Sequence, residues 1–187
     1  MSTTHSESHQ GLGTALMTLA LLIRQVSAAA QEPSGDQKPD HLERVPLEIL
    51  ADGERHTLQV ELAQTAAERR NGLMDRDFLA PDTGMLFVYQ YPQPPQGGFW
   101  MYRTRIPLDI AFIDEQGRIA ARYTMQPCMS GNPSDCPATL AGVTYHAALE
   151  VNAGYFEEYG IGEGACVSWP GWSAGCTSDT TAEQETP

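Results

Sequence analysis

The most chemically distinctive stretch of this sequence is WMYRTRIPLD, at residues 100–109. It places two arginines one residue apart in a chain that has only 11 Lys and Arg residues. A guanidinium group offers a planar fork of donors that matches a carboxylate or phosphate, and neighbouring aromatic rings can stack on a sugar. The stretch therefore predicts a site for a small anionic or carbohydrate-like molecule. Its candidate ligand-binding residues are Trp100, Tyr102, Arg103, Thr104, Arg105 and Asp109.

Positioning these groups requires an extended chain. Alternate residues of a strand share a face, so Arg103 and Arg105 would point the same way and Thr104 the opposite way. Asp109 would then orient one of the guanidinium groups. A purely structural interpretation stays open, with both arginines on a solvated face, Trp100 in the core and Asp109 in a structural hydrogen bond.

Charged residues also flank the GLM sequence at residues 72–74. They are Arg69, Arg70, Asp75 and Arg76, and they would join the predicted site if this segment folds against it. Asp75 and Arg76 are adjacent in the sequence, and a surface ion pair between them is the simpler interpretation.

Glu150 is the best isolated candidate for an acid or base. On a strand it would point away from its neighbours Leu149 and Val151, and a buried carboxyl group can carry a proton. It would serve equally well as the partner of an arginine. The short motifs of serine hydrolases, zinc peptidases and P-loop enzymes are absent, so no catalytic residue is assigned and the question of enzymatic activity stays open.

The four cysteines, Cys128, Cys136, Cys166 and Cys176, all lie in the C-terminal third of the chain. Four cysteines allow three pairings, and in an oxidising compartment disulfide formation is expected. Pairing between nearest neighbours would close two short loops, although the sequence does not select among the three schemes. A Cu(I) site of thioethers and thiolates is an alternative. The methionines lack tight M-x-M spacing, so we predict no metal and no cofactor.

The elements that must carry these residues are short. Asp52-Gly53 predicts a tight hairpin turn, and Thr65 with Glu68 has the spacing of a capping box for a short helix that ends at Gly72. A second short helix is expected within residues 154–160. Strands are predicted at 45–50, 56–63, 84–89, 99–101, 106–113, 118–125, 144–151 and 165–169. This pattern predicts an α+β, mainly β fold, a compact small barrel-like sheet with two short helices.

The N-terminus predicts export. An uncharged apolar run at residues 12–23 is followed by small residues, which indicates a signal peptide over 1–30 and a periplasmic or secreted protein without a stable membrane span after cleavage. The leading segment has no Lys or Arg, so an uncleaved anchor and a cytosolic leader stay open. We expect a flexible lead-in at 31–44, one globular domain at 45–172 and an acidic disordered tail at 173–187. The net charge of −13 argues against nucleic acid as a partner.

Several segments resemble the family called domain of unknown function 192, which comprises small, often exported prokaryotic proteins. They are ERRNGLM (68–74), GMLFVY (84–89), FWMYRTRIPLDIAFID (99–114) and ALEVNAGYFEEYGI (148–161). Cys128 and Cys136 lie in segments that resemble a cysteine-pair variant of the family. Members usually follow FWM with Lys-Asn-Thr, whereas this chain has Tyr102-Arg103-Thr104, which puts a shared ligand in doubt. The resemblance implies no reaction.

Three functions are therefore weighed. The first is an exported, non-catalytic or accessory domain that binds a small anionic or carbohydrate-like ligand or an envelope partner through residues 100–109. The second is an enzyme acting on cell-envelope polymers, with Glu150 or Asp109 as acid or base. The third is a Cu(I)-handling protein. An enzyme should hold a carboxyl group of raised pKa in a pocket beside the arginines, whereas a binding domain should present arginines and rings on one open face.

Overall fold

The computed structural model describes residues 42–172. Its elements are β1 (Arg44–Ala51), β2 (Glu54–Ala63), α1 (Ala66–Asn71), β3 (Thr83–Gln93), β4 (Gly98–Trp100), β5 (Leu108–Ile113), β6 (Ile119–Met125), the 3₁₀ turn η1 (Pro133–Asp135), β7 (Ala138–Leu140), β8 (Tyr145–Asn152), α2 (Tyr155–Glu158) and β9 (Cys166–Ser168). The predicted mainly β fold with two short helices is confirmed. The predicted signal peptide, most of the lead-in and the acidic tail lie outside the described residues.

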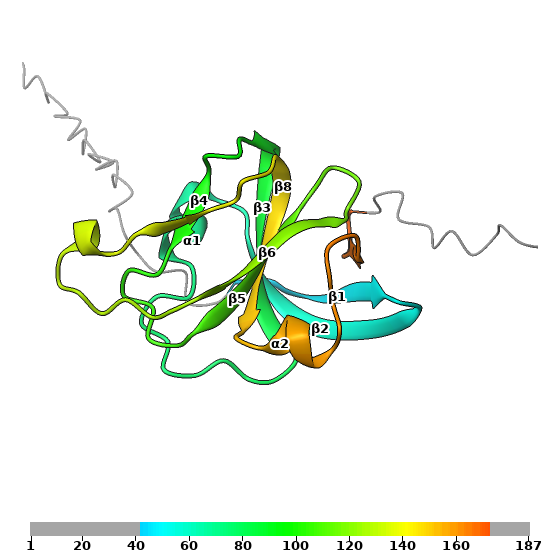
Figure 1. The fold of residues 1–187 in the computed structure, drawn as a ribbon, viewed down its shortest axis with the longest axis horizontal. Coiled ribbons are helices and arrows are strands. Elements are labelled where there is room, and N and C mark those ends of the chain that lie inside the picture. Colours follow the sequence, from blue (N-terminus) through cyan, green and yellow to red (C-terminus); the bar gives the residue numbers. More distant parts are fainter. Residues whose placement is uncertain (1–41, 173–187) are drawn as a thin grey trace, which may run out of the picture. The chain divides into compact units, whose positions relative to one another are not determined.

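Seven strands form one curled sheet in the order β6-β5-β8-β3-β2-β1-β9 (Figure 1). Only β2 and β3 run parallel among these pairs, and α1 lies in the connection between them. The two ends of the sheet meet, because the Val167 amide donates to the Gly117 carbonyl at 2.7 Å and the Ile119 amide donates to the Ala165 carbonyl at 2.9 Å. The predicted barrel-like sheet is therefore confirmed.

The sheet has a hydrophobic cluster on each face because side chains alternate along its strands. One cluster draws on all seven strands and on α2, and it fills the inside of the curl with residues such as Leu47, Val60 and Phe156. The second lies on the outer face, where Met85, Phe87 and other residues pack under the covering segments. Those covering segments contribute Leu73, Leu79, Phe99 and Met101.

The local turn and cap predictions are confirmed. Asp52 and Gly53 have φ values of 49° and 81°, as the tight β1–β2 hairpin requires. The Thr65 side chain accepts from the Glu68 amide, and the Glu68 carboxylate accepts from the Thr65 amide at 2.8 Å. The Thr65 amide, and with it the Gln64 amide, donates to this carboxylate and lowers the pKa of Glu68. Helix α1 then ends at Gly72.

Two elements differ from the sequence prediction. The strand predicted at residues 84–89 is longer, because β3 continues to Gln93 and includes Pro92. A register shift between Val88 and Gln93 leaves the proline outside the regular ladder, where its missing N–H costs nothing. Strand β7 was not predicted, and it pairs with β4 in a separate two-stranded sheet.

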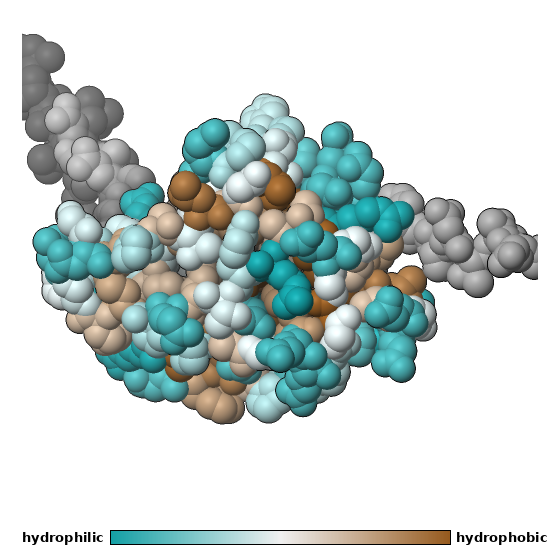
Figure 2. All heavy atoms as spheres, viewed as in Figure 1, coloured by the Kyte–Doolittle hydropathy of each residue, from teal (hydrophilic) through white to brown (hydrophobic). Residues whose placement is uncertain are grey.

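One disulfide is present in the described part of the chain. Cys128 and Cys136 are bonded, with their Cα atoms 5.8 Å apart, as the nearest-neighbour scheme expects. Cys166 is not a free thiol either, and its predicted partner Cys176 lies outside the described residues. No helix among residues 42–172 has the length and apolar character needed to span a membrane. Figure 2 shows hydrophilic residues over most of the visible face, with hydrophobic residues in small separate groups.

Candidate functional site

Residues 100–109 do not form the single extended segment that was predicted. Strand β4 ends at Trp100 and β5 begins at Leu108. Between them, the Thr104 amide donates to the Met101 carbonyl at 2.9 Å and closes a turn in which Arg103 has a φ of +58°. The prediction that Arg103 and Arg105 share a strand face was therefore wrong.

Arg103 adopts a left-handed backbone conformation. Its positive φ is a conformation that asparagine tolerates better than most residues, and asparagine is the usual family residue at this position. Two backbone hydrogen bonds hold the turn in place. The Arg103 amide donates to the Cys128 carbonyl at 3.0 Å, and the Asp75 amide donates to the Arg103 carbonyl at 2.8 Å. The turn is thus tied to both the disulfide loop and the segment that follows α1.

Both arginines nevertheless meet in one place. Arg103 forms a two-pronged ion pair with Asp75, whose Oδ1 lies 3.2 Å from Arg103 Nε. Arg105 donates to Asp77 at 2.8 Å and lies 3.8 Å from Asp75. The Asp77 carboxylate raises the pKa of Arg105. We call these four residues the Arg–Asp cluster, and its two positive and two negative charges balance.

The segment after GLM therefore does fold against the predicted site. The expected pair between Asp75 and Arg76 was wrong, because Arg76 instead binds Glu61 with contacts of 3.0 and 2.5 Å. That guanidinium lowers the pKa of Glu61. Asp77 was missed in the sequence, although its D-x-D spacing with Asp75 mirrors the R-x-R spacing opposite and was the available signal.

Two aromatic residues lie within three positions of Arg103 in the chain. Trp100 is 41% exposed, and its ring centroid lies 5.3 Å from that of Tyr102 at an angle of 40°. Strand β4 explains this exposure, since Phe99 faces the outer-face core and its neighbour Trp100 must face away from it. We call the ring pair of Trp100 and Tyr102 the aromatic shelf. Rings and guanidinium groups therefore lie within one short segment, as the sequence predicted.

Asp109 does not orient either arginine. Its carboxylate accepts from the Thr124 hydroxyl at 2.6 Å, and from the amides of Gly154 at 2.9 Å and Phe156 at 3.4 Å. Only 3% of the residue is exposed. Asp109 thus joins β5 to β6 and to the start of α2, and the orienting role expected for it was wrong.

Glu150 is also buried, on the other face of the sheet from Asp109. In the ladder it lies opposite Met85 and Ile110, whereas Asp109 lies opposite Val151. Burial raises the pKa of Glu150 to about 8, so its carboxyl group is largely neutral at pH 7. Thr104 is the third buried polar residue, at 4% exposed. The two candidate acids are thus separated by the thickness of the sheet.

Four sulfur atoms that a Cu(I) site could use are engaged elsewhere. Met85, Met101 and Met125 are buried in the outer-face cluster, and the Cys128 sulfur belongs to a disulfide. Within residues 42–172, no cluster of three or more His, Cys, Asp and Glu side chains has the arrangement of a metal site. The buried methionines are accounted for by core packing.

Comparison with known proteins places the domain in a family. The family DUF192, described as uncharacterized ACR, matches residues 47–169. A solved structure from Sinorhizobium meliloti 1021, provisionally described as a transcription regulator, is 31% identical with a TM-score of 0.60, and the match covers 68% of this chain and 95% of that one. A protein of unknown function from Novosphingobium aromaticivorans DSM 12444 is 33% identical with a TM-score of 0.60, over 71% and 90% of the two chains. No curated protein matches this sequence. The chain belongs to the DUF192 family.

Proposed function

We propose that this protein is an exported, non-catalytic binding domain whose ligand is a neutral carbohydrate held on the aromatic shelf. The observation that carries the proposal is the Trp100–Tyr102 ring pair, in which Trp100 is 41% exposed and Tyr102 directly precedes Arg103 of the Arg–Asp cluster in the chain. Sugar rings present C–H faces that pack on aromatic rings, and their hydroxyl groups both donate and accept hydrogen bonds. A cluster of guanidinium and carboxylate groups offers the matching acceptors and donors.

The charges favour a neutral ligand over the anionic one that the arginines alone suggested. Arg103 and Arg105 are each paired with an aspartate, so an incoming anion would have to displace Asp75 or Asp77. The chain as a whole carries a net charge of −13, which also repels anions. A polyhydroxylated neutral molecule avoids both costs.

Two observations support export. The apolar run at residues 12–23 followed by small residues is typical of a signal peptide. The Cys128–Cys136 disulfide is expected in an oxidising compartment rather than in the cytosol. An exported sugar-binding domain would meet its ligand among the polymers of the cell envelope or in the medium.

The competing functions have weaker support. An enzyme should place a carboxyl group of raised pKa beside the arginines, but Glu150 packs opposite Met85 and Ile110, and Asp109 is bound to α2. The description of the Sinorhizobium protein as a transcription regulator is not carried over to this chain, because a net charge of −13 opposes approach to phosphates.

The proposal is tested by titrating the purified chain with cellotriose, chitotriose and maltotriose, followed by tryptophan fluorescence and calorimetry. We expect at least one trisaccharide to bind, and Trp100→Ala to weaken its binding at least tenfold, as the loss of a stacked ring predicts (about 1.4 kcal/mol or more). Tyr159→Ala is the matched control, since Tyr159 is an exposed aromatic residue on the end of α2. Equal weakening by both variants, or no binding of any trisaccharide, contradicts the proposal.

Arg103→Asn separates binding from folding. It introduces the usual family residue at a position whose φ of +58° suits asparagine, so the turn should be kept while the guanidinium is lost. We expect unchanged cooperative unfolding together with weaker trisaccharide binding. Glucose 6-phosphate serves as the anionic probe, and tighter binding of this phosphate than of the trisaccharides would favour the anion-binding alternative.

A further inference from the structure

A second polar site lies on the inner face of the sheet, away from the β4–β7 pair. In the β5–β6 ladder, Arg122 lies opposite Ala111 and Thr124 lies opposite Asp109, and Ala111 belongs to the cluster inside the curl. Together with α2 and the loop after it, these strands line a cavity of about 330 Å³ that is open to solvent. The cavity is lined by Asp109, Arg122, Tyr123, Thr124, Phe156 and Glu163.

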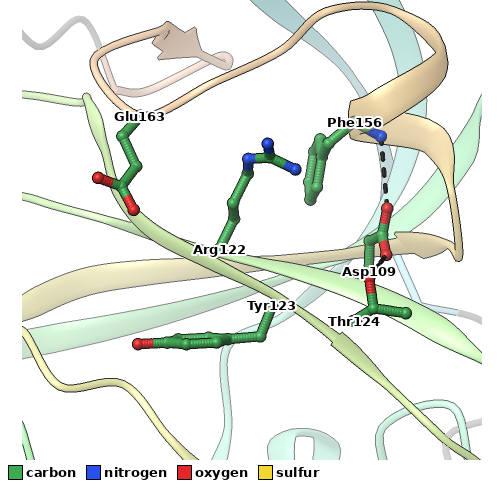
Figure 3. A pocket seen from close by; sticks show the side chains of 6 residues that line it. All are labelled: Asp109, Arg122, Tyr123, Thr124, Phe156 and Glu163. Atoms are coloured by element: carbon green, nitrogen blue, oxygen red, sulfur yellow. Dashed lines mark hydrogen bonds between the residues drawn. The ribbon is translucent and has the colours of Figure 1, made fainter.

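Two opposite charges face this cavity without neutralising each other. Figure 3 shows the Arg122 side chain extending into the space between the Phe156 ring and Glu163. Neither Arg122 nor Glu163 has a hydrogen bond or ion pair in the described part of the chain. By contrast, the arginines of the Arg–Asp cluster are both paired.

The remaining wall of the cavity is rigid. The Asp109 carboxylate already accepts three hydrogen bonds, from Thr124, Gly154 and Phe156, so it fixes the geometry more than it offers free acceptors. The Phe156 side chain is buried at 1% exposure and cannot swing away. Because these walls are already fixed, only the exposed Arg122 and Glu163 side chains have to be ordered when a ligand binds.

We propose that this cavity binds a small zwitterion of the α-amino acid class, with the ligand carboxylate on Arg122 and its ammonium group on Glu163. A simple anion would meet the Glu163 carboxylate, and a simple cation would meet the Arg122 guanidinium, whereas a zwitterion satisfies both. The cavity lies at the small end of the range of ligand sites, roughly 300–1,000 Å³, which suits a molecule of amino-acid size. This site is separate from the aromatic shelf and does not depend on the carbohydrate proposal.

The test is a ¹H–¹⁵N NMR titration of the full chain with glycine, L-alanine, L-serine and L-glutamate. With at least one of these amino acids, we expect the amide chemical shifts of Arg122, Phe156 and Glu163 to change and to reach saturation. With acetate or methylamine, we expect no saturation. Arg122→Gln and Glu163→Gln should each weaken binding at least tenfold. Both residues are exposed and unpaired, so these variants should fold normally.

Matched controls isolate the cavity. Arg70→Gln removes another exposed arginine, on α1, and Glu54→Gln removes an exposed glutamate at the start of β2, so each repeats the charge change at a residue that does not line the cavity. Trp100→Ala should leave amino-acid binding unchanged. Saturable binding of acetate as tight as that of glycine would show a plain anion site and overturn the proposal. So would binding that survives in both cavity variants, or an absence of shifts with all four amino acids.

Discussion

At the scale of single residues, Glu150 illustrates how position decides charge. The sequence places it on a strand between two apolar neighbours, and the fold covers it with the outer-face core until 5% remains exposed. Removing a carboxylate from water without a compensating partner favours its neutral form. The pKa of about 8 follows from burial alone. At neutral pH this residue behaves as a buried carboxylic acid, not as an arginine's partner.

A pH-dependent stability follows from this carboxyl group. Its pKa is about 8 in the folded chain and 4.5 as the ordinary value. The folded state therefore binds more protons than the unfolded state between these values, and stability falls as pH rises through that window. The full effect is about 5 kcal/mol. We expect Glu150→Gln, which cannot ionise, to abolish most of this fall when urea unfolding is measured from pH 4.5 to 8.5.

The control for this measurement is Glu157→Gln, because Glu157 is exposed on α2 and should leave the pH profile unchanged. If wild type and Glu150→Gln lose stability in parallel between pH 4.5 and 8, then Glu150 is not the group responsible.

At the scale of elements, α2 shows how a helix too short to form alone is held in place. It has four residues, Tyr155–Glu158, and an isolated helix of that length is unstable in water. Two contacts with the rest of the domain stabilise this helix. The Phe156 side chain is buried inside the curl, and the Asp109 carboxylate on β5 accepts from the Gly154 and Phe156 amides. The same attachment forms one wall of the cavity at Arg122.

Weakening that attachment should loosen α2 before it unfolds the sheet. Asp109→Asn removes the charge from three hydrogen bonds and turns one acceptor atom into a donor, so we expect a loss of about 2–3 kcal/mol in unfolding free energy. The Gly154 and Phe156 amides should exchange hydrogen faster. Thr124→Val is the control, since it removes only the hydroxyl bond and should cost about 1 kcal/mol without changing exchange at α2. Unchanged amide exchange in Asp109→Asn would contradict this role.

At the scale of the whole domain, the meeting of the two sheet ends is the defining feature. Strand β9 pairs with β1, opposing Val167 to Ile49, and the Val167 amide also donates to the Gly117 carbonyl before β6. Closing the curl in this way covers exposed strand edges and encloses the inner cluster. Strand β9 has only three residues, yet as the last strand of the order it brings the sheet back to β6, the first strand.

Breaking the contact between the two sheet ends should lower the free energy of unfolding more than shortening a core side chain does. Val167→Pro loses the amide that bonds to Gly117 and alters the backbone of β9, so we expect a loss of about 3 kcal/mol or more. Val167→Ala keeps the amide and removes only two methyl groups from the core, at roughly 1–2 kcal/mol. Urea unfolding of the two variants measures the difference. Equal losses would mean that the hydrogen bond between the sheet ends contributes nothing measurable.

The sequence by itself determined the local features of this protein. The Asp52-Gly53 hairpin, the Thr65–Glu68 cap and most strands were predicted because turn geometry, helix capping and side-chain alternation depend on residues close together in the chain. The DUF192 family and the mainly β class followed from the same short segments. The binding surface at residues 100–109 was also inferred from residue types alone, and it stays a prediction.

The tertiary structure decided which distant residues meet. Two of its contacts link residues that are far apart in the chain, namely the Arg103–Asp75 pair and the attachment of Asp109 to α2. The fold also brings Arg122 and Glu163 to the same cavity. Ion pairing and burial depend on strand order and on which face each strand turns inward, and neither is encoded in a local pattern. That is why the sequence found arginines and aspartates but assigned Asp75 and Asp109 to the wrong partners.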